Sequence, residues 1–130
     1  MKKQIESISN PYLSSDHSIK ENSHSAYNFH KTLPGYLPTP LLNLKHLARE
    51  IGIRDCYIKD ESQRLGLNAF KVLGASYAMA EEIKKYIPIR QSNLSFASIK
   101  NQRKSIENLT FVTATDGNHG RAVAWCAEQY

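Results

Sequence analysis

Residues 109–120 decide the fold class, and they read Leu-Thr-Phe-Val-Thr-Ala-Thr-Asp-Gly-Asn-His-Gly. Residues 109–114 are nearly continuous in apolar character, which is typical of a β-strand that is covered on both faces. The five residues from Asp116 to Gly120 contain two glycines and predict a tight turn. From Arg121 onward, small and apolar residues predict a helix. A strand, a turn and a helix in this order are typical of an α/β protein.

The segment upstream predicts another helix, followed by a short strand. Thr39 suits the N-cap of this helix, and Pro40 suits its first position because a missing N–H costs nothing there. Apolar residues then recur at helical spacing as far as Ile51, and Gly52 is placed to end the helix. Residues 56–59, Cys-Tyr-Ile-Lys, predict the strand.

Two more helices are expected between this strand and the stretch quoted first. Residues 69–86 predict the longer helix, which Asn68 can cap and Pro88 closes. The polar connection that follows predicts a short helix around residues 95–106. Because strand, helix, strand and helix alternate, we expect a parallel βαβ unit. The fold class is therefore α/β, with a partial parallel sheet and helices on both faces.

The chain divides into a tail and one folded segment. Residues 1–26 are polar and aperiodic, so we expect a flexible tail there. Residues 27–130 form the folded segment. Its last helix, residues 121–130, is apolar nearly all round and needs cover on several sides, yet no strand follows to return against the sheet. We therefore expect residues 27–130 to be an incomplete part of a larger domain.

The composition excludes several classes of protein. The chain has 130 residues, 41% hydrophobic and 22% charged, which is typical of one small globular domain. No apolar run approaches the ~20 residues that a membrane helix needs, and the basic start has no apolar block of a secretory signal behind it. Cys56 and Cys126 lie far apart, so we expect two reduced thiols in a cytoplasmic protein.

The net charge of +5 raises the question of a nucleic-acid partner. Basic residues gather between Lys84 and Lys104, where no acidic residue occurs. Only Tyr86 and Phe96 could stack on bases there, and no zinc-finger or RNA-binding signature accompanies them. We expect a solvated surface and no nucleic-acid partner.

Lys71 is the first residue with candidate chemistry. It is the only charge in residues 69–80, which are otherwise apolar or small. Gly74, Ala75 and Ala78 share its face and are small enough for a flat ring to lie against the helix. Desolvation would favour the neutral amine, which is the form that attacks an aldehyde. A surface lysine that stretches along the helix would give the same pattern, so the helix alone leaves both interpretations open.

The turn at residues 116–120 is the second candidate. A strand that ends in a glycine turn and a helix N-terminus presents backbone N–H groups where α/β proteins bind anions and ligands. Asn118 can donate and accept hydrogen bonds, whereas Asp116 can act as a base or simply cap the helix. His119 has no partner at metal-ligand spacing, so we expect no metal site.

Together the two segments resemble the pyridoxal-phosphate enzymes of the tryptophan-synthase-β type, known as fold type II. The resemblance rests on Asn-Ala-Phe-Lys at residues 68–71 and Thr-Asp-Gly-Asn-His-Gly at residues 115–120. In that superfamily the lysine after Phe binds the cofactor covalently, and the asparagine of the turn lies against the ring oxygen. The resemblance gives these roles to Lys71 and Asn118, with pyridoxal 5'-phosphate as the cofactor.

A finer resemblance is to the diaminopropionate ammonia-lyases, and it covers about residues 27–130. It rests on motifs within residues 29–41, 59–71 and 111–121. Asp116 is the discriminating residue, because most dehydratases of the superfamily have Ser or Thr there. That family converts both enantiomers of 2,3-diaminopropionate to pyruvate and ammonia by α,β-elimination.

The resemblance also implies roles and partners. Lys71 would remove the α-proton from one face of the substrate, and Asp116 would serve the mirror-image substrate from the other face. The whole enzyme would be a homodimer. Members of that family are much longer and hold the cofactor phosphate on a later glycine-rich loop, so we expect this polypeptide to be inactive alone. A serine or threonine dehydratase, and a non-catalytic fragment that binds a complementary chain, stay open as alternatives.

Overall fold

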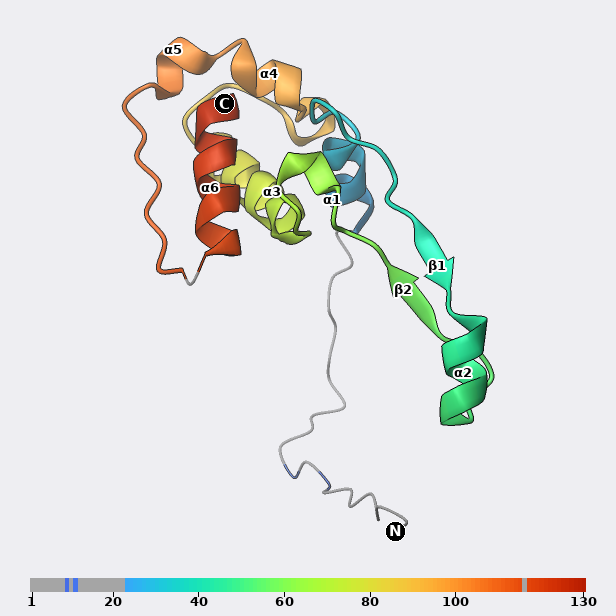
Figure 1. Ribbon diagram of the computed structural model, residues 1–130. Coiled ribbons are helices and arrows are strands. Elements are labelled where there is room, and N and C mark those ends of the chain that lie inside the picture. Colours follow the sequence, from blue (N-terminus) through green and yellow to red (C-terminus); the bar gives the residue numbers. More distant parts are fainter. Residues whose placement is uncertain (1–8, 10, 12–22, 116) are drawn as a thin grey trace.

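Figure 1 shows the computed structural model of the chain, which describes residues 9, 11, 23–115 and 117–130. A body of helices carries an arm of two short strands and one helix, which projects from one side (Figure 1). The body contains the hydrophobic core, whereas every residue of the two strands is exposed.

Two helices packed against each other form the centre of the body, α3 (Lys71–Ile83) and α6 (Asn118–Gln129). Alanines at the contact allow close approach of the two backbones, because they add little bulk between the helices. The buried residues of the pair are Val72, Ala75, Ser76, Met79, Ala80 and Ile83 from α3, and Ala122 and Cys126 from α6.

Shorter helices cover this pair. α1 (Ser23–His30) packs against α3, and its Phe29 is 1% exposed. A 3-10 turn, η2 (Gln91–Asn93), leads to α4 (Phe96–Lys100) and α5 (Arg103–Ile106), which lie together at one end of the body (Figure 1).

A capping box fixes the start of α4. The Ser95 hydroxyl accepts a 3.1 Å hydrogen bond from the Ser98 amide, and the Ser98 hydroxyl accepts one of 2.9 Å from the Ser95 amide. Ile99 and Ile106 then reach the core. The short helix expected at residues 95–106 is therefore present, but as two helices.

The arm consists of β1 (Leu41–Asn43), α2 (Lys45–Ile51) and β2 (Tyr57–Lys59). The strands pair antiparallel, with Leu42 opposite Ile58. The predicted strand is confirmed, and so is the end of the helix: Gly52 has a φ of 76°, the left-handed conformation that a glycine cap adopts.

Thr39 is not the cap of that helix, contrary to the sequence expectation. The segment after Pro40 pairs with β2 as a strand, and α2 begins only at Lys45. The Thr39 hydroxyl instead donates a hydrogen bond to Glu61. Pairing with β2 outweighs the local Thr-Pro preference, as tertiary contacts commonly do.

The expected parallel sheet is also absent from the described residues, whose only sheet is the antiparallel pair of β1 and β2. Residues 109–115 run without helix or strand hydrogen bonding on the side of the body away from the arm (Figure 1). A strand needs a neighbour for its backbone N–H and C=O groups, and the described residues place none beside this segment.

Several boundaries differ from the sequence expectation. α1 begins at Ser23, so the last residues of the expected tail are helical, and nearly all of residues 1–22 lie outside the described residues. α3 begins at Lys71 and follows Phe70, so Asn68 is not its cap. α6 begins at Asn118, three residues before the expected start. No helix in the described part of the chain is long and apolar enough to cross a membrane.

Candidate active site

Lys71 is the first residue of α3, and its side chain is half-buried. Ala75, one turn along the same face, is buried, whereas Gly74 and Ala78 are exposed. The confinement that the sequence predicts for this amine is therefore partial. The exposed small residues Gly74 and Ala78 leave a face of α3 against which a flat ring could lie.

The loop that leads to Lys71 contains three residues in the left-handed region. Leu65, Gly66 and Asn68 have φ values of 48°, 72° and 58°. Glycine adopts this conformation freely and asparagine tolerates it, but a leucine there costs roughly 1–2 kcal/mol. Such strain persists only where the surrounding structure holds the backbone in place, and it is concentrated at functional sites.

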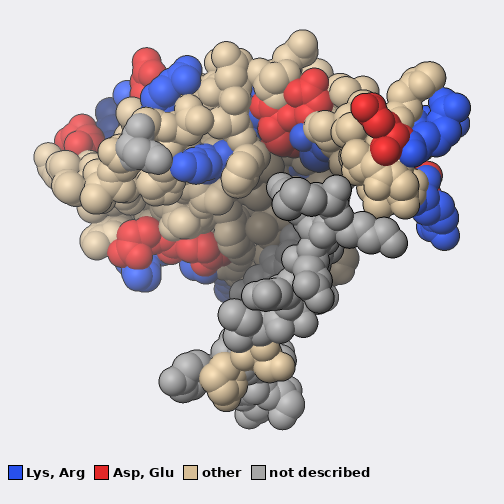
Figure 2. Space-filling model, turned by 60° about the horizontal axis from the view of Figure 1, so that its bottom comes forward, with Lys and Arg blue, Asp and Glu red and all other residues tan. Residues whose placement is uncertain are grey.

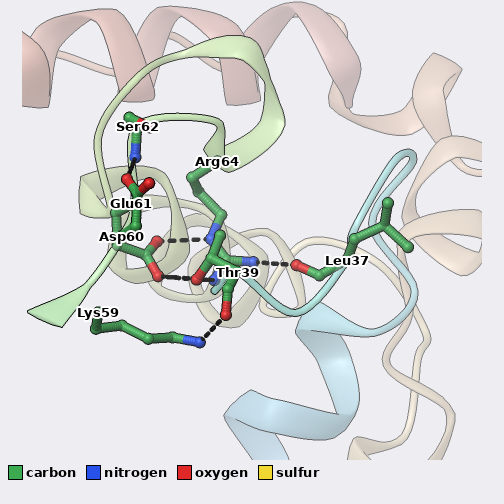
Figure 3. A network of polar contacts seen from close by, with 7 residues as sticks. All are labelled: Leu37, Thr39, Lys59, Asp60, Glu61, Ser62 and Arg64. Atoms are coloured by element: carbon green, nitrogen blue, oxygen red, sulfur yellow. Dashed lines mark hydrogen bonds and ion pairs between the residues drawn. The ribbon is translucent and has the colours of Figure 1, made fainter. Parts of the chain in front are cut away.

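A network around Arg64 holds the start of this loop (Figure 3). The Arg64 guanidinium donates to both carboxylate oxygens of Glu61, at 2.7 and 2.9 Å. It also donates to the Leu37 carbonyl at 2.7 Å and to the Thr39 hydroxyl at 3.0 Å. The Thr39 hydroxyl in turn donates to Glu61 at 2.5 Å. This network ties the segment before β1 to the segment after β2.

The electrostatics of this network are those of an ion pair between a buried arginine and a half-buried glutamate. Arg64 is 4% exposed, and hydrogen bonds from its guanidinium lower the pKa of Glu61 to about 2. The same pairing raises the pKa of Arg64. Both groups are therefore charged at neutral pH. Removing one partner of such a pair is costly, because the other charge is left buried and uncompensated.

His30 joins α1 to the beginning of α3. Its Nε2 atom lies 2.7 Å from the carbonyl oxygen of Leu73, two residues after Lys71. Burial lowers the pKa of His30 and outweighs the opposing effect of this hydrogen bond. The ring packs edge-on against Phe29 and Tyr77. The first turn of α3 is thus supported from the side of α1.

The second candidate segment is organised by Thr115. The Thr115 hydroxyl accepts hydrogen bonds from the amides of Gly117, at 3.2 Å, and Gly120, at 2.8 Å. Gly117 has a φ of 143°, which side chains rarely allow, and a Cβ at Gly120 would overlap the methyl group of Thr115. The turn therefore requires both glycines; Gly117 is the N-cap of α6, and the Thr115 hydroxyl satisfies the Gly120 amide in its first turn.

Of the residues that the sequence singles out in this turn, Asn118 is the first residue of α6 and is exposed. Asp116 lies outside the described residues. Sequence reasoning missed the role of Thr115 as the hydroxyl acceptor. A threonine two residues before one glycine and five before another was the available signal.

A groove of about 260 Å³ lies where α3, α6 and the extended segment meet. It is mainly apolar, and its lining residues are Ala75, Ala78, Met79, Glu82, Phe111, Val112, Thr113, His119 and Val123. Lys71 stands one turn before Ala75, and Asn118 is adjacent to His119. The structure thus carries both predicted residues on two helices that pack together and that both line this groove, although neither Lys71 nor Asn118 is itself a lining residue.

On the face that Figure 2 shows, basic and acidic side chains are mixed rather than gathered by sign. Two of the basic residues that the sequence places in an acid-free stretch are paired with glutamates one turn earlier in α3: Lys84 lies 2.6 Å from Glu81, and Lys85 lies 2.5 Å from Glu82. No group of three potential metal ligands occurs within the part of the chain that the structure describes.

The residues present fit a flat aldehyde cofactor. An amine stands at the start of one helix, an amide stands at the start of the helix packed on it, and a mainly apolar groove is lined by small residues of α3 and by residues of α6. Lys71 could hold the aldehyde carbon, and Asn118 could hydrogen-bond a ring oxygen.

The chain is similar to known proteins over most of its length. The diaminopropionate ammonia-lyase of Salmonella typhimurium is 50% identical over 108 residues, which are 82% of this chain and 27% of that protein. The enzyme of the same name from Escherichia coli K12 is 48% identical over 104 residues, 80% of this chain and 26% of that protein. The chain therefore spans about a quarter of the length of these relatives.

Solved structures agree with the sequence relatives. The Escherichia coli diaminopropionate ammonia lyase in complex with an aminoacrylate-PLP azomethine reaction intermediate matches with a TM-score of 0.70 and 44% identity, over 82% of this chain and 26% of that one. The complex of the same enzyme with D-serine matches with a TM-score of 0.65 and 40% identity, over 82% and 27%. The described part of the chain thus has the fold of the N-terminal part of those enzymes.

The family comparison covers the two candidate segments together. The family described as pyridoxal-phosphate dependent enzyme matches residues 32–130, which include Lys71 and the turn at residues 115–120. This match covers most of the chain, and one of the similar solved structures is a complex with a PLP reaction intermediate. This chain belongs to the pyridoxal-phosphate dependent enzymes.

Proposed function

We propose that this chain supplies the lysine-bearing part of a pyridoxal-phosphate dependent lyase that converts 2,3-diaminopropionate to pyruvate and ammonia by α,β-elimination. The observation that carries the proposal is the packing of α3, which begins at Lys71, against α6, which begins at Asn118. The names of the relatives supply the substrate, because both compared enzymes are diaminopropionate ammonia-lyases at about half identity.

Each residue has a role in this proposal. The cofactor, when bound, withdraws electrons from the α-carbon of the substrate and makes its proton removable. Lys71 would hold the cofactor and, once the amine of the substrate has taken its place there, would accept the α-proton from one face; Asn118 would orient the cofactor ring. Asp116 accepts the proton from the opposite face; its place is a proposal from sequence alone, since it lies outside the described residues.

The chain alone is expected to hold the cofactor weakly. The N-terminus of α6 can contribute up to ~2 kcal/mol to anion binding, whereas micromolar retention needs about 8 kcal/mol. We therefore expect no turnover from the 130 residues by themselves. The free thiols Cys56 and Cys126 suit a cytoplasmic location, and the family resemblance suits a homodimer of the whole enzyme.

The direct test is cofactor capture by the full chain. Pyridoxal phosphate is added, the absorbance of the covalent adduct is recorded, borohydride makes the adduct permanent, and peptide mapping locates it. We expect Lys71 to be labelled ahead of the exposed Lys100, and Lys71→Ala to abolish the band while Lys100→Ala retains it. Equal labelling of all lysines would contradict the role of Lys71.

A chimera tests the reaction itself. Residues 23–130 replace the matching segment of the Salmonella typhimurium enzyme, and pyruvate is measured with diaminopropionate as substrate. Turnover that Lys71→Ala removes would support the proposal. A soluble chimera that binds the cofactor yet leaves diaminopropionate intact would contradict it.

A dehydratase of hydroxy amino acids is the second candidate. The observation in its favour is that one matched structure is a complex with D-serine. Offering the chimera serine, threonine, D-serine and diaminopropionate side by side separates the two, because the faster substrate identifies the activity. A third reading, a non-catalytic fragment that only binds a complementary chain, predicts association with such a chain and no pyruvate from any of the four.

A further inference from the structure

Arg64 is the one described charged residue that is almost wholly buried in the body of the chain, at 4% exposure. The proposed reaction gives it no task. Its guanidinium reaches two segments of the chain: the carbonyl of Leu37 and the hydroxyl of Thr39 before β1, and the carboxylate of Glu61 after β2 (Figure 3). It also stacks over the Tyr36 ring, 5.2 Å from the ring centroid. A residue with so many contacts fixes the backbone that carries it.

That backbone is the start of the strained loop before Lys71. The left-handed residues begin immediately after Arg64, at Leu65, and the Leu67 amide donates back to the Arg64 carbonyl at 2.9 Å. At the other end, Val72 is fully buried and His30 contacts the Leu73 carbonyl. The six residues between Arg64 and Lys71 are therefore held at both ends.

We propose that Arg64 is a positioning residue for Lys71: its bonds to Leu37, Thr39 and Glu61 hold residues 65–70 in their strained path and so set where the lysine stands. This inference rests on the proposed role of Lys71. It assigns Arg64 no contact with substrate or cofactor.

The geometry of the Arg64 guanidinium matters as well as its charge. Arg64 bonds Glu61 through two parallel N–H groups and points a third toward Leu37, which a lysine ammonium cannot reproduce. The Thr39 hydroxyl both accepts from Arg64 and donates to Glu61, so its orientation is fully specified. Hence Arg64→Lys retains the charge but loses the paired N–H groups that bond Glu61. Thr39→Ser retains the hydroxyl, whereas Thr39→Val removes it at nearly equal side-chain volume.

The test uses the full chain with two measurements. The first is borohydride-trapped labelling by pyridoxal phosphate, expressed as the ratio of adduct at Lys71 to adduct at Lys100. The second needs no cofactor: hydrogen exchange of the amides of residues 65–70, compared with those of α6. Arg54→Gln, at a 96% exposed arginine that pairs with its neighbour Asp55, is the matched control.

We expect Arg64→Lys and Thr39→Val to lower the labelling ratio by about tenfold or more, because small displacements of a reacting group are costly. Exchange at residues 65–70 should rise by a similar factor while α6 stays protected. Thr39→Ser and Arg54→Gln should match the wild type. Thr39→Ser loses the methyl group but keeps the hydroxyl, so wild-type behaviour of this variant would show that the hydroxyl matters and the bulk of the side chain does not.

The outcomes separate the two proposals. If wild-type Lys71 is not labelled selectively, the proposed function fails, and the exchange measurement still tests the loop. Faster exchange in Thr39→Val then supports the conclusion that the Arg64 network holds residues 65–70, and unchanged exchange overturns it. If wild-type Lys71 is labelled and Thr39→Val leaves both the ratio and the exchange unchanged, Arg64 is not a positioning residue. Should Arg64→Lys fail to fold, the threonine pair decides alone.

Discussion

The amide of Gly120 donates a 2.8 Å hydrogen bond to the hydroxyl of Thr115, and the two residues are so close that any side chain at position 120 would overlap the threonine methyl group. This contact closes the turn that precedes α6. It also explains why glycine is needed at a helical position, where its flexibility is otherwise a disadvantage.

The first prediction follows from that contact. Gly120→Ala should destabilise the chain by about 1–3 kcal/mol, because Thr115 must move and its bond to the turn is lost. Gly74→Ala is the matched control: it lies in α3 with no atom within 4 Å of the added carbon, so it should stabilise by roughly 0.5–1 kcal/mol. Urea unfolding followed by circular dichroism measures both. Equal shifts in the same direction would refute the steric argument.

The second prediction concerns the end of α6. The Tyr130 hydroxyl donates to the Ser76 carbonyl at 2.7 Å in a buried setting, and Tyr130 is 4% exposed. Tyr130→Phe should cost about 1–2 kcal/mol by removing that bond while keeping the ring. Tyr86→Phe, at a ring that is 55% exposed, should be nearly neutral. Thermal unfolding of the two variants side by side decides; a neutral Tyr130→Phe would mean that the bond adds nothing.

How far the sequence predicts this structure depends on the range of the interactions. The end of α2 at Gly52, the strand at residues 57–59 and the core helix after Lys71 follow from local spacing. The pairing of β1 with β2 does not, because it joins residues that are far apart in sequence and whose strands are both exposed. Hydrophobic alternation carries no signal for strands without a buried face.

The candidate site shows the same division. Lys71 and Asn118 stand out because their neighbours are unusual for a helix and a turn. Arg64 does not, because a charged residue in a polar loop predicts exposure, and only the fold brings Leu37, Thr39 and Glu61 around it. The local sequence shows only that Arg64 follows Glu61 by three residues, a spacing that is equally typical of an ion pair on an exposed surface.

The third prediction is a pH dependence that comes from His30. Burial lowers the pKa of His30 below its usual 6.5, so the unfolded chain binds this proton more readily than the folded chain. Stability from this group is therefore complete above about pH 6.5 and is lost as the pH falls below that value. The urea concentration at the midpoint of unfolding should therefore fall from pH 8 to pH 6 and again from pH 6 to pH 5.

His30→Gln should flatten this dependence between pH 8 and 5, and the exposed His46→Gln serves as its control. The stability from Glu61 is present above its usual pKa of 4.5 and is lost as the pH falls from there toward its folded-state pKa of about 2, so Glu61 adds little to the change between pH 8 and 5. A wild-type midpoint that stays constant over the three pH values would contradict the lowered pKa of the half-buried His30.

The fourth prediction concerns the second base. If Lys71 and Asp116 stand on opposite faces of the substrate, each serves one enantiomer, and a positioned base contributes typically ~10²–10⁴-fold to the rate. In the active chimera, Asp116→Asn should therefore suppress turnover of one enantiomer of diaminopropionate by about a hundredfold or more and leave the other within a few-fold. Pyruvate release from the separate enantiomers measures this, with cofactor absorbance confirming that the variant is loaded. Equal losses for both enantiomers would show that Asp116 supports the turn rather than the proton transfer, and would leave Lys71 as the single base.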